Sequence, residues 1–161
     1  MKIIDGYAEI PDLDTFLNKI GEISDETGST IQLFDADYVA GEQHLQRATE
    51  VAMRAVDRGM TIAREPAVEI LLYASGRRQI NRALEMGVSE GSQAVVGVVT
   101  GGDETAAAAA VEALLVSEAV EWGSRETLTT FFEVTDAELA AVDDDLEAIV
   151  LERVALLTVE Q

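Results

Sequence analysis

Residues 93–99, QAVVGVV, constrain the fold more than any other segment, because almost every side chain in the run is apolar. Such a short, valine-rich run is typical of a buried strand. TGGD follows it and leads into ETAAAAAVEALL, which predicts a helix capped by Asp103. The Gly-Gly turn resembles part of a phosphate-binding loop, but the lysine and the serine or threonine of that loop are missing.

Strand-like and helix-like patterns alternate along the rest of the chain. Residues 2–9 and 29–34 predict two more strands, and residues 117–122 predict a short fourth one. Helices are expected at residues 12–23, at 41–58 and at 66–75, each followed by a glycine that can end it. A further short helix is expected at 77–86, with Ile80, Ala83 and Leu84 on its inner side.

A capping box, Thr135 with Glu138, predicts the start of one long C-terminal helix. Its apolar ladder indicates core packing, and part of it offers a surface for a partner through Leu139, Val142 and Leu146. The chain has no run of roughly 18 apolar residues, the length that a membrane span requires, and its first residues lack a signal-peptide layout. We therefore expect a soluble cytoplasmic protein that makes no contact with a membrane.

The chain is strongly acidic, with 31 Asp and Glu against 11 Lys and Arg and a net charge of −20. The carboxylates are dispersed over the whole sequence, which favours a solvated surface suited to a cytoplasm of high salt over a specific acidic site. We expect stability to rise from low to molar KCl, because the Debye length falls to about 3 Å at 1 M salt.

Seven of the basic residues fall between Arg47 and Arg82, and all seven are arginine. We call this set the arginine island. It shares its window with only four carboxylates, so an acidic chain carries one basic segment. Arginine suits bidentate contact with phosphate and stacking on bases. The members are Arg47, Arg54, Arg58, Arg64, Arg77, Arg78 and Arg82.

Two local patterns within the island suggest binding. His44, Arg47, Arg54 and Arg58 recur at helical spacing along one edge of the predicted helix at 41–58. A solvated face whose arginines pair with Glu50 and Asp57 explains this edge equally well. The second pattern is the junction 75–78, Ser-Gly-Arg-Arg, which places guanidinium groups and free backbone donors at a helix start.

Nothing in the sequence indicates catalysis. The chain has one histidine and no cysteine, so a familiar serine or cysteine triad is excluded. Asp35 and Asp37 are two carboxylates in a turn without a third ligand, which favours a loop or helix cap over a metal site. We expect a non-catalytic binding protein without metal or cofactor.

The run 69–80, EILLYASGRRQI, together with Ala83 and Gly87, resembles the signature of the small regulatory subunit of the KEOPS complex, in an archaeal, halophilic form. FFEVT at 131–135 and LERVAL at 151–156 fit the same family. The resemblance implies one α/β domain over residues 1–161, with a mainly antiparallel (mixed) sheet of about four strands covered by helices. It also implies a non-catalytic subunit in the installation of threonylcarbamoyladenosine next to the anticodon of tRNA.

The family likeness further implies that the protein binds the small atypical kinase of the complex, meets the other KEOPS subunits indirectly and recruits tRNA through its single-stranded CCA end. The motif match carries the tRNA-binding role to residues 77–80. Charge and spacing extend it to the rest of the island and its neighbours. A stand-alone scaffolding or small-molecule-sensing α/β domain is the main alternative, and an enzyme that uses a pair of carboxylates is a second one. The full predicted set is His44, Arg47, Arg54, Arg58, Ile62, Arg64, Arg77, Arg78, Gln79, Ile80 and Arg82.

Overall fold

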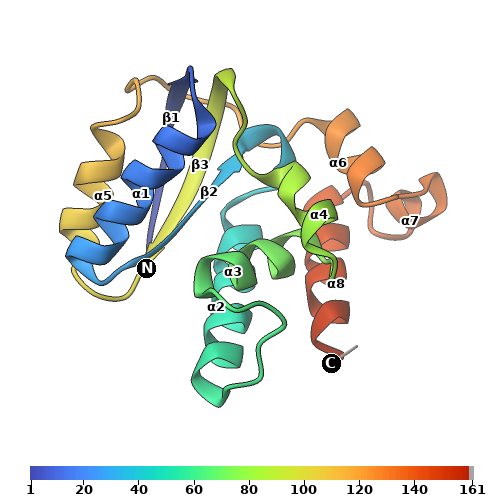
Figure 1. The fold of residues 1–161 in the computed structure, drawn as a ribbon. Coiled ribbons are helices and arrows are strands. Elements are labelled where there is room, and N and C mark those ends of the chain that lie inside the picture. Colours follow the sequence, from blue (N-terminus) through green and yellow to red (C-terminus); the bar gives the residue numbers. More distant parts are fainter. Residues whose placement is uncertain (160–161) are drawn as a thin grey trace. The chain divides into compact units, whose positions relative to one another are not determined.

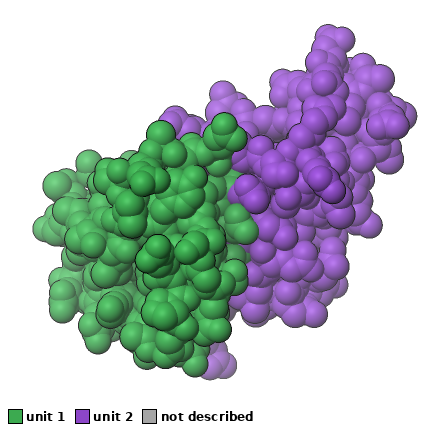
Figure 2. Space-filling model, turned by 90° about the horizontal axis from the view of Figure 1, so that it is seen from above, with its two compact units in different colours: residues 1–36, 87–121 green, residues 37–86, 122–161 purple. Residues whose placement is uncertain are grey.

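The computed structural model describes residues 1–159 and divides the chain into two compact units (Figure 2). The first unit comprises residues 1–36 and 87–121, and the second comprises residues 37–86 and 122–161. Each unit is therefore assembled from two stretches that are separated in the sequence. The single domain expected over residues 1–161 stays a prediction.

The first unit contains a three-stranded antiparallel sheet (Figure 1). Its strands are β1 (Lys2–Ile10), β2 (Thr30–Asp35) and β3 (Gly91–Thr100), in the order β1-β3-β2. The apolar run 93–99 thus lies in the central strand, as its composition requires. The α/β class and the three strands predicted at 2–9, 29–34 and 93–99 are confirmed.

Helices α1 (Leu13–Thr27) and α5 (Glu104–Glu112) pack against each other and cover one face of this sheet (Figure 1). Alternate side chains of each strand point into this core because successive residues of a strand face opposite sides. At the centre, Gly97 lies opposite Ile4 and Leu33. A Cβ at Gly97 would overlap the Leu33 side chain, so the missing side chain makes room for its neighbours. The core includes Ile4, Ala8, Ile10, Phe16, Ile20, Ile31, Leu33, Val95, Val99, Ala107 and Val111.

The fourth strand predicted at residues 117–122 is wrong. Only Val116 pairs with the sheet, through an isolated bridge in which the Tyr7 N–H donates to the Val116 carbonyl at 3.0 Å and the Val116 N–H donates back at 2.7 Å. The chain then leaves β1 without further strand pairing. Gly6 permits this approach, because a Cβ there would lie 2.9 Å from the Val116 carbonyl oxygen.

The Gly-Gly turn before α5 packs against the C-terminal end of α1. Gly102 adopts a left-handed φ of 57°, and a Cβ there would overlap the backbone of Thr27 and Gly28 at the end of α1. The Asp103 N–H donates to the Thr27 carbonyl at 2.9 Å, and the Asp103 carboxylate accepts from the Ala106 N–H at 3.1 Å. The cap predicted at Asp103 is confirmed. Close backbone packing explains Gly102, whereas Gly101 has open space and a left-handed φ of 79°.

The second unit is helical. It begins within the 3-10 turn η1 (Ala36–Tyr38) and continues through α2 (Glu42–Arg58), α3 (Pro66–Ser75), α4 (Ile80–Ala83) and the 3-10 turn η2 (Leu84–Met86). After the first unit's second segment come α6 (Arg125–Phe131), α7 (Asp136–Ala141) and α8 (Leu146–Val159). Helices α2, α3 and α8 pack together as its centre. The buried side of α2 includes Leu45, Ala48, Ala52 and Ala55.

The single C-terminal helix predicted from Thr135 onward is in fact two helices. The capping box forms as predicted, but Asp143 and Asp144 take left-handed φ values of 52° and 66° and separate α7 from α8. Aspartate tolerates this conformation better than most residues. The Asp145 carboxylate then accepts from the Ala148 N–H at 3.2 Å and so supports the first turn of α8.

Candidate nucleic-acid interface

All seven members of the arginine island belong to the second unit, on the hairpin formed by α2 and α3 and on the segment that follows it. Helix α2 leads down to a loop at residues 59–65, and α3 follows this loop and packs against α2 (Figure 1). We call the C-terminal end of α2 with this loop the hairpin tip, and residues 76–84 the α4 end. The two lie at opposite ends of the hairpin (Figure 1).

The exposed edge of α2 carries three of the arginines. Arg54 and Arg58 are exposed and form no ion pair among the described residues. Arg47 approaches Glu50 at 4.0 Å, with both side chains well exposed. Such a surface pair contributes between nothing and about 1 kcal/mol. Among the described residues, the suggested pairing of this edge with Glu50 and Asp57 is therefore seen only between Arg47 and Glu50. The guanidinium groups of Arg54 and Arg58 form no ion pair there.

His44, in contrast, does not belong to this edge. It is fully buried: Nδ1 accepts from the Ala40 N–H at 3.0 Å, and Nε2–H donates to the Ala74 carbonyl at 2.7 Å. Burial lowers the pKa of His44 to about 4, against the raising effect of the Ala74 hydrogen bond. The neutral ring ties α2 to the end of α3, so it offers neither positive charge to RNA nor a free nitrogen for proton transfer.

The tip loop is held from inside by a buried carboxylate. Glu69, on the first turns of α3, is 0% exposed and accepts from the Ile62 N–H at 3.0 Å and from the Ala63 N–H at 2.7 Å. Ala63 is buried with it and Ile62 is half-buried. Arg64, the next residue, is exposed without an ion pair among the described residues. The backbone of Ile62 is thus held by Glu69, and the nucleic-acid contact predicted for Ile62 stays a prediction.

Arg77 is engaged within the protein. Its guanidinium donates to the Phe131 carbonyl, lies 5.1 Å from the centroid of the Phe131 ring and reaches Glu133 at 3.5 Å. Only 21% of its side chain is exposed. The backbone assists, because the Ser75 hydroxyl accepts the Arg77 N–H at 3.2 Å and donates to the Leu72 carbonyl at 2.8 Å. Arg77 therefore joins α3 to α6, and the tRNA-binding role predicted for it stays a prediction.

Arg78, Gln79, Ile80 and Arg82 are all exposed at the α4 end. Arg78 has no ion pair among residues 1–159, while Arg82 makes a loose pair with Glu85 at 3.6 Å. Contrary to the sequence prediction, Ile80 and Leu84 are not on an inner side: they are 47% and 57% exposed, and only Ala83 is buried. The α4 end therefore combines guanidinium, amide and apolar groups on its surface.

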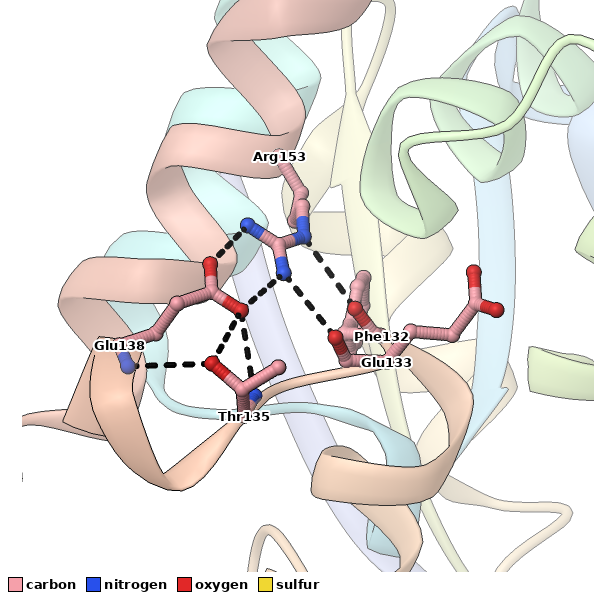
Figure 3. Close-up of polar contacts among 5 residues, drawn as sticks. All are labelled: Phe132, Glu133, Thr135, Glu138 and Arg153. Atoms are coloured by element: carbon pink, nitrogen blue, oxygen red, sulfur yellow. Dashed lines mark hydrogen bonds and ion pairs between the residues drawn. The ribbon is translucent and has the colours of Figure 1, made fainter.

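Arg153 was not predicted as a functional residue, yet it is the centre of a polar network that joins α8 to α7 and to the segment after α6 (Figure 3). Its guanidinium forms a bidentate pair with Glu138 at 2.8 and 3.0 Å and donates to the carbonyls of Phe132 and Glu133 at 3.2 and 3.3 Å. The hydrogen bond from Arg153 is the main cause that lowers the pKa of Glu138 to about 2. Together with Arg77, which binds the Phe131 carbonyl, Arg153 holds three successive carbonyls at the C-terminal end of α6.

The apolar residues predicted to dock a partner are not an open face. Leu139 is buried at 7% exposure, and Val142 and Leu146 are half-buried.

No helix among the described residues is long and apolar enough to cross a membrane. Within the same residues, no group of three or more His, Cys, Asp or Glu side chains is placed to hold a metal ion.

The surface of the hairpin therefore suits an anionic partner. Four guanidinium groups, those of Arg54, Arg58, Arg64 and Arg78, are exposed without a carboxylate partner in the described part of the chain. Guanidinium groups bind phosphate with two parallel hydrogen bonds. Such groups are suited to binding and positioning an anionic ligand.

Comparison with known proteins identifies the family. No curated protein gave a match to this sequence. Residues 8–158 match the family described as "Kinase binding protein CGI-121". The match spans nearly the whole chain, including the hairpin, the junction after α3 and the Arg153 network. The chain therefore belongs to the CGI-121 family of kinase-binding proteins.

Proposed function

We propose that this protein is a non-catalytic, cytoplasmic subunit of the KEOPS complex that binds the kinase subunit and recruits tRNA through its single-stranded CCA end. Family membership supports the kinase partner. In this proposal the protein serves the formation of threonylcarbamoyladenosine and meets the other subunits indirectly. Its net charge of −20 suits a halophilic archaeal cytoplasm.

One observation supports the tRNA-binding role: four exposed arginines form no ion pair with a carboxylate of residues 1–159, although the chain contains 31 acidic residues. In so acidic a protein, random placement would give exposed guanidinium groups nearby carboxylates. Because no such pairs form in the described part of the chain, these guanidinium groups are available to an external anion. Nucleic acid supplies such anions in a regular array.

The α4 end is the part suited to the CCA terminus. An unpaired RNA end exposes phosphates, 2′-hydroxyls and base faces, and proteins bind it with cations beside stacking or apolar surfaces. Arg78 supplies the cation, Gln79 a donor and acceptor, and Ile80 an exposed apolar side chain. Arg77 serves this surface from below by anchoring the junction to α6.

The test compares intact tRNA with tRNA from which the CCA end has been trimmed, using the full chain alone and bound to its kinase subunit. Arg78→Glu should remove most of the preference for intact tRNA and leave kinase association unchanged. Arg125→Glu is the matched control, since Arg125 is an exposed arginine that pairs with Asp144 at 2.7 Å, outside the hairpin. If Arg78→Glu keeps the full preference for intact tRNA, the CCA site lies elsewhere.

The small-molecule sensor has little structural support at this junction. A cavity of about 100 Å³ lies there, lined by Ser75, Gly76, Arg77, Phe132, Glu133 and Arg153. Ligand pockets usually measure about 300–1,000 Å³. The arginines that line the cavity are also engaged with backbone carbonyls and carboxylates, so the site is better explained as a packed joint.

A further inference from the structure

The hairpin tip differs in chemistry from the α4 end. It exposes Arg54, Arg58 and Arg64, none of which forms an ion pair among residues 1–159. Asp57 and Glu65 lie close to them in sequence but likewise enter no ion pair among these residues. The large apolar side chain exposed at this end is Met60, at 64%. The tip therefore carries three exposed arginines beside two exposed carboxylates, a net charge of +1, and offers little surface for base stacking.

The loop that carries Arg64 has a fixed conformation. Gly59 ends α2 with a left-handed φ of 65°, and the Met60 N–H donates to the Ala55 carbonyl at 3.0 Å. On the other side, Glu69 holds the backbone of residues 62 and 63 from within. A buried carboxylate that accepts backbone N–H groups needs no external cation, because those hydrogen bonds satisfy it. Glu69 thus shapes the loop and leaves the arginines unpaired.

The tip is too far from the α4 end for one small ligand to reach both. His44 contacts Ala74 at the α4 end of the hairpin, and Arg58 lies fourteen residues further along the same helix. At 1.5 Å per residue the separation is about 20 Å. That length corresponds to about six base steps of 3.4 Å along a nucleic-acid strand. Only an extended polyanion can contact both ends at once.

From this geometry we propose that the hairpin tip is a second RNA contact, which binds the phosphate backbone of the paired stem adjoining the single-stranded end, with Glu69 as its positioning residue. This inference rests on the proposed tRNA-binding function. Paired RNA presents phosphates and 2′-hydroxyls but buries its base faces, so cations without stacking partners suit it. A single strand would instead require a stacking surface, which belongs to the α4 end.

The test measures RNA affinity as a function of KCl concentration for the full chain with its kinase subunit. The variant replaces Arg54, Arg58 and Arg64 by glutamine, and the matched control is Arg125→Gln. Four probes are compared: intact tRNA, CCA-trimmed tRNA, a blunt RNA duplex and a short single strand ending in CCA. Loss of three phosphate contacts should reduce the slope of log K against log salt by up to about 3, at roughly 0.9 per contact.

The expected pattern is a reduced slope and weaker binding for intact tRNA, trimmed tRNA and the duplex, with the short single strand unaffected. An unchanged slope for the duplex would overturn the inference, and so would an equal loss for the short single strand. The CCA proposal fails separately, through Arg78→Glu, if intact and trimmed tRNA remain distinguished. The two failures are therefore distinguishable.

Glu69 is tested by a double-mutant cycle with Arg64. Glu69→Gln should weaken duplex binding in the native background but add nothing further in an Arg64→Gln background, because the carboxylate acts by placing that arginine. Kinase association and the circular dichroism spectrum are measured on the same samples to establish that each variant is folded. Fully additive losses of duplex affinity would contradict the positioning role.

Discussion

Replacing Arg77 by alanine tests whether this arginine stabilises the protein from inside. The change removes the hydrogen bond to the Phe131 carbonyl, the cation–π contact with the Phe131 ring and the ion pair with Glu133. A hydrogen bond from a charged donor contributes about 1.5–3 kcal/mol, and a partly exposed cation–π contact about 0.5–1 kcal/mol. The ion pair adds under about 1 kcal/mol, because Glu133 is 77% exposed.

These three contributions meet at one guanidinium and are not additive, so we expect Arg77→Ala to lower the free energy of unfolding by about 2–4 kcal/mol. Arg77→Lys should fall between the native protein and the alanine variant, since lysine keeps the charge but lacks the planar fork. Arg78→Ala is the control one residue away. Because Arg78 is exposed without an ion pair in the described region, its effect should stay within about 0.5 kcal/mol.

Urea unfolding at a fixed molar KCl concentration, followed by circular dichroism, gives the free energies of unfolding of the native protein and of the three variants by linear extrapolation. Keeping the salt constant matters because the net charge of −20 makes stability sensitive to screening. Equal unfolding midpoints for Arg77→Ala and Arg78→Ala would refute the structural role of Arg77 and return it to the predicted RNA surface.

Three further predictions concern backbone, pH and packing. Gly76→Ala should destabilise the protein more than Gly59→Ala. Both glycines have left-handed φ values, 64° and 65°, which cost about 1–2 kcal/mol for a residue with a side chain, but only at Gly76 would a Cβ crowd Arg153, at 3.2 Å. Thermal unfolding of the two variants in parallel measures the difference, and equal losses of stability would contradict it. The folded pKa of His44 is lowered from 6.5 to about 4, so the unfolded state binds more protons than the folded state between these values. The free energy of unfolding should therefore fall by about 1.5 kcal/mol from pH 6.5 to pH 5. Denaturant titrations across this range should show a shallower pH dependence in His44→Asn, and identical slopes would contradict the burial of a neutral His44. Gly97→Ala should destabilise the sheet by about 1–3 kcal/mol through overpacking against the leucine on the neighbouring strand, measured as a lower urea midpoint, and no change would show that the leucine moves aside freely.

The sequence was sufficient for most elements of the fold because their signals are local. Gly28, Gly59 and Gly76 end the helices that they follow, as predicted. The apolar run 93–99 is indeed a buried strand. The strand prediction at residues 117–122 was wrong because a short segment of mixed polar and apolar residues carries no information about whether a strand edge is available for pairing. Only a partner across the chain, in this case Tyr7 for Val116, decides that question.

The candidate site was less predictable because its distinctions depend on distant contacts. Arg77 and Arg78 are chemically identical neighbours, and only the position of Phe131, 54 residues away, separates an internal anchor from a surface cation. His44 shares helical spacing with the arginines, but the carbonyl of Ala74 determines that its ring is buried. Glu69 gave no local signal, since its hydrogen-bond partners are set by the course of the loop.

The order in which the chain supplies its strands has a consequence for its synthesis on the ribosome. Strands β1 and β2 emerge first but are not bonded to each other, because β3, which pairs with both, begins only at Gly91. Until that segment is translated, two strands rich in apolar residues have unpaired edges, a state prone to association between chains. Nascent chains that pause before residue 91 should therefore be the ones that molecular chaperones retain.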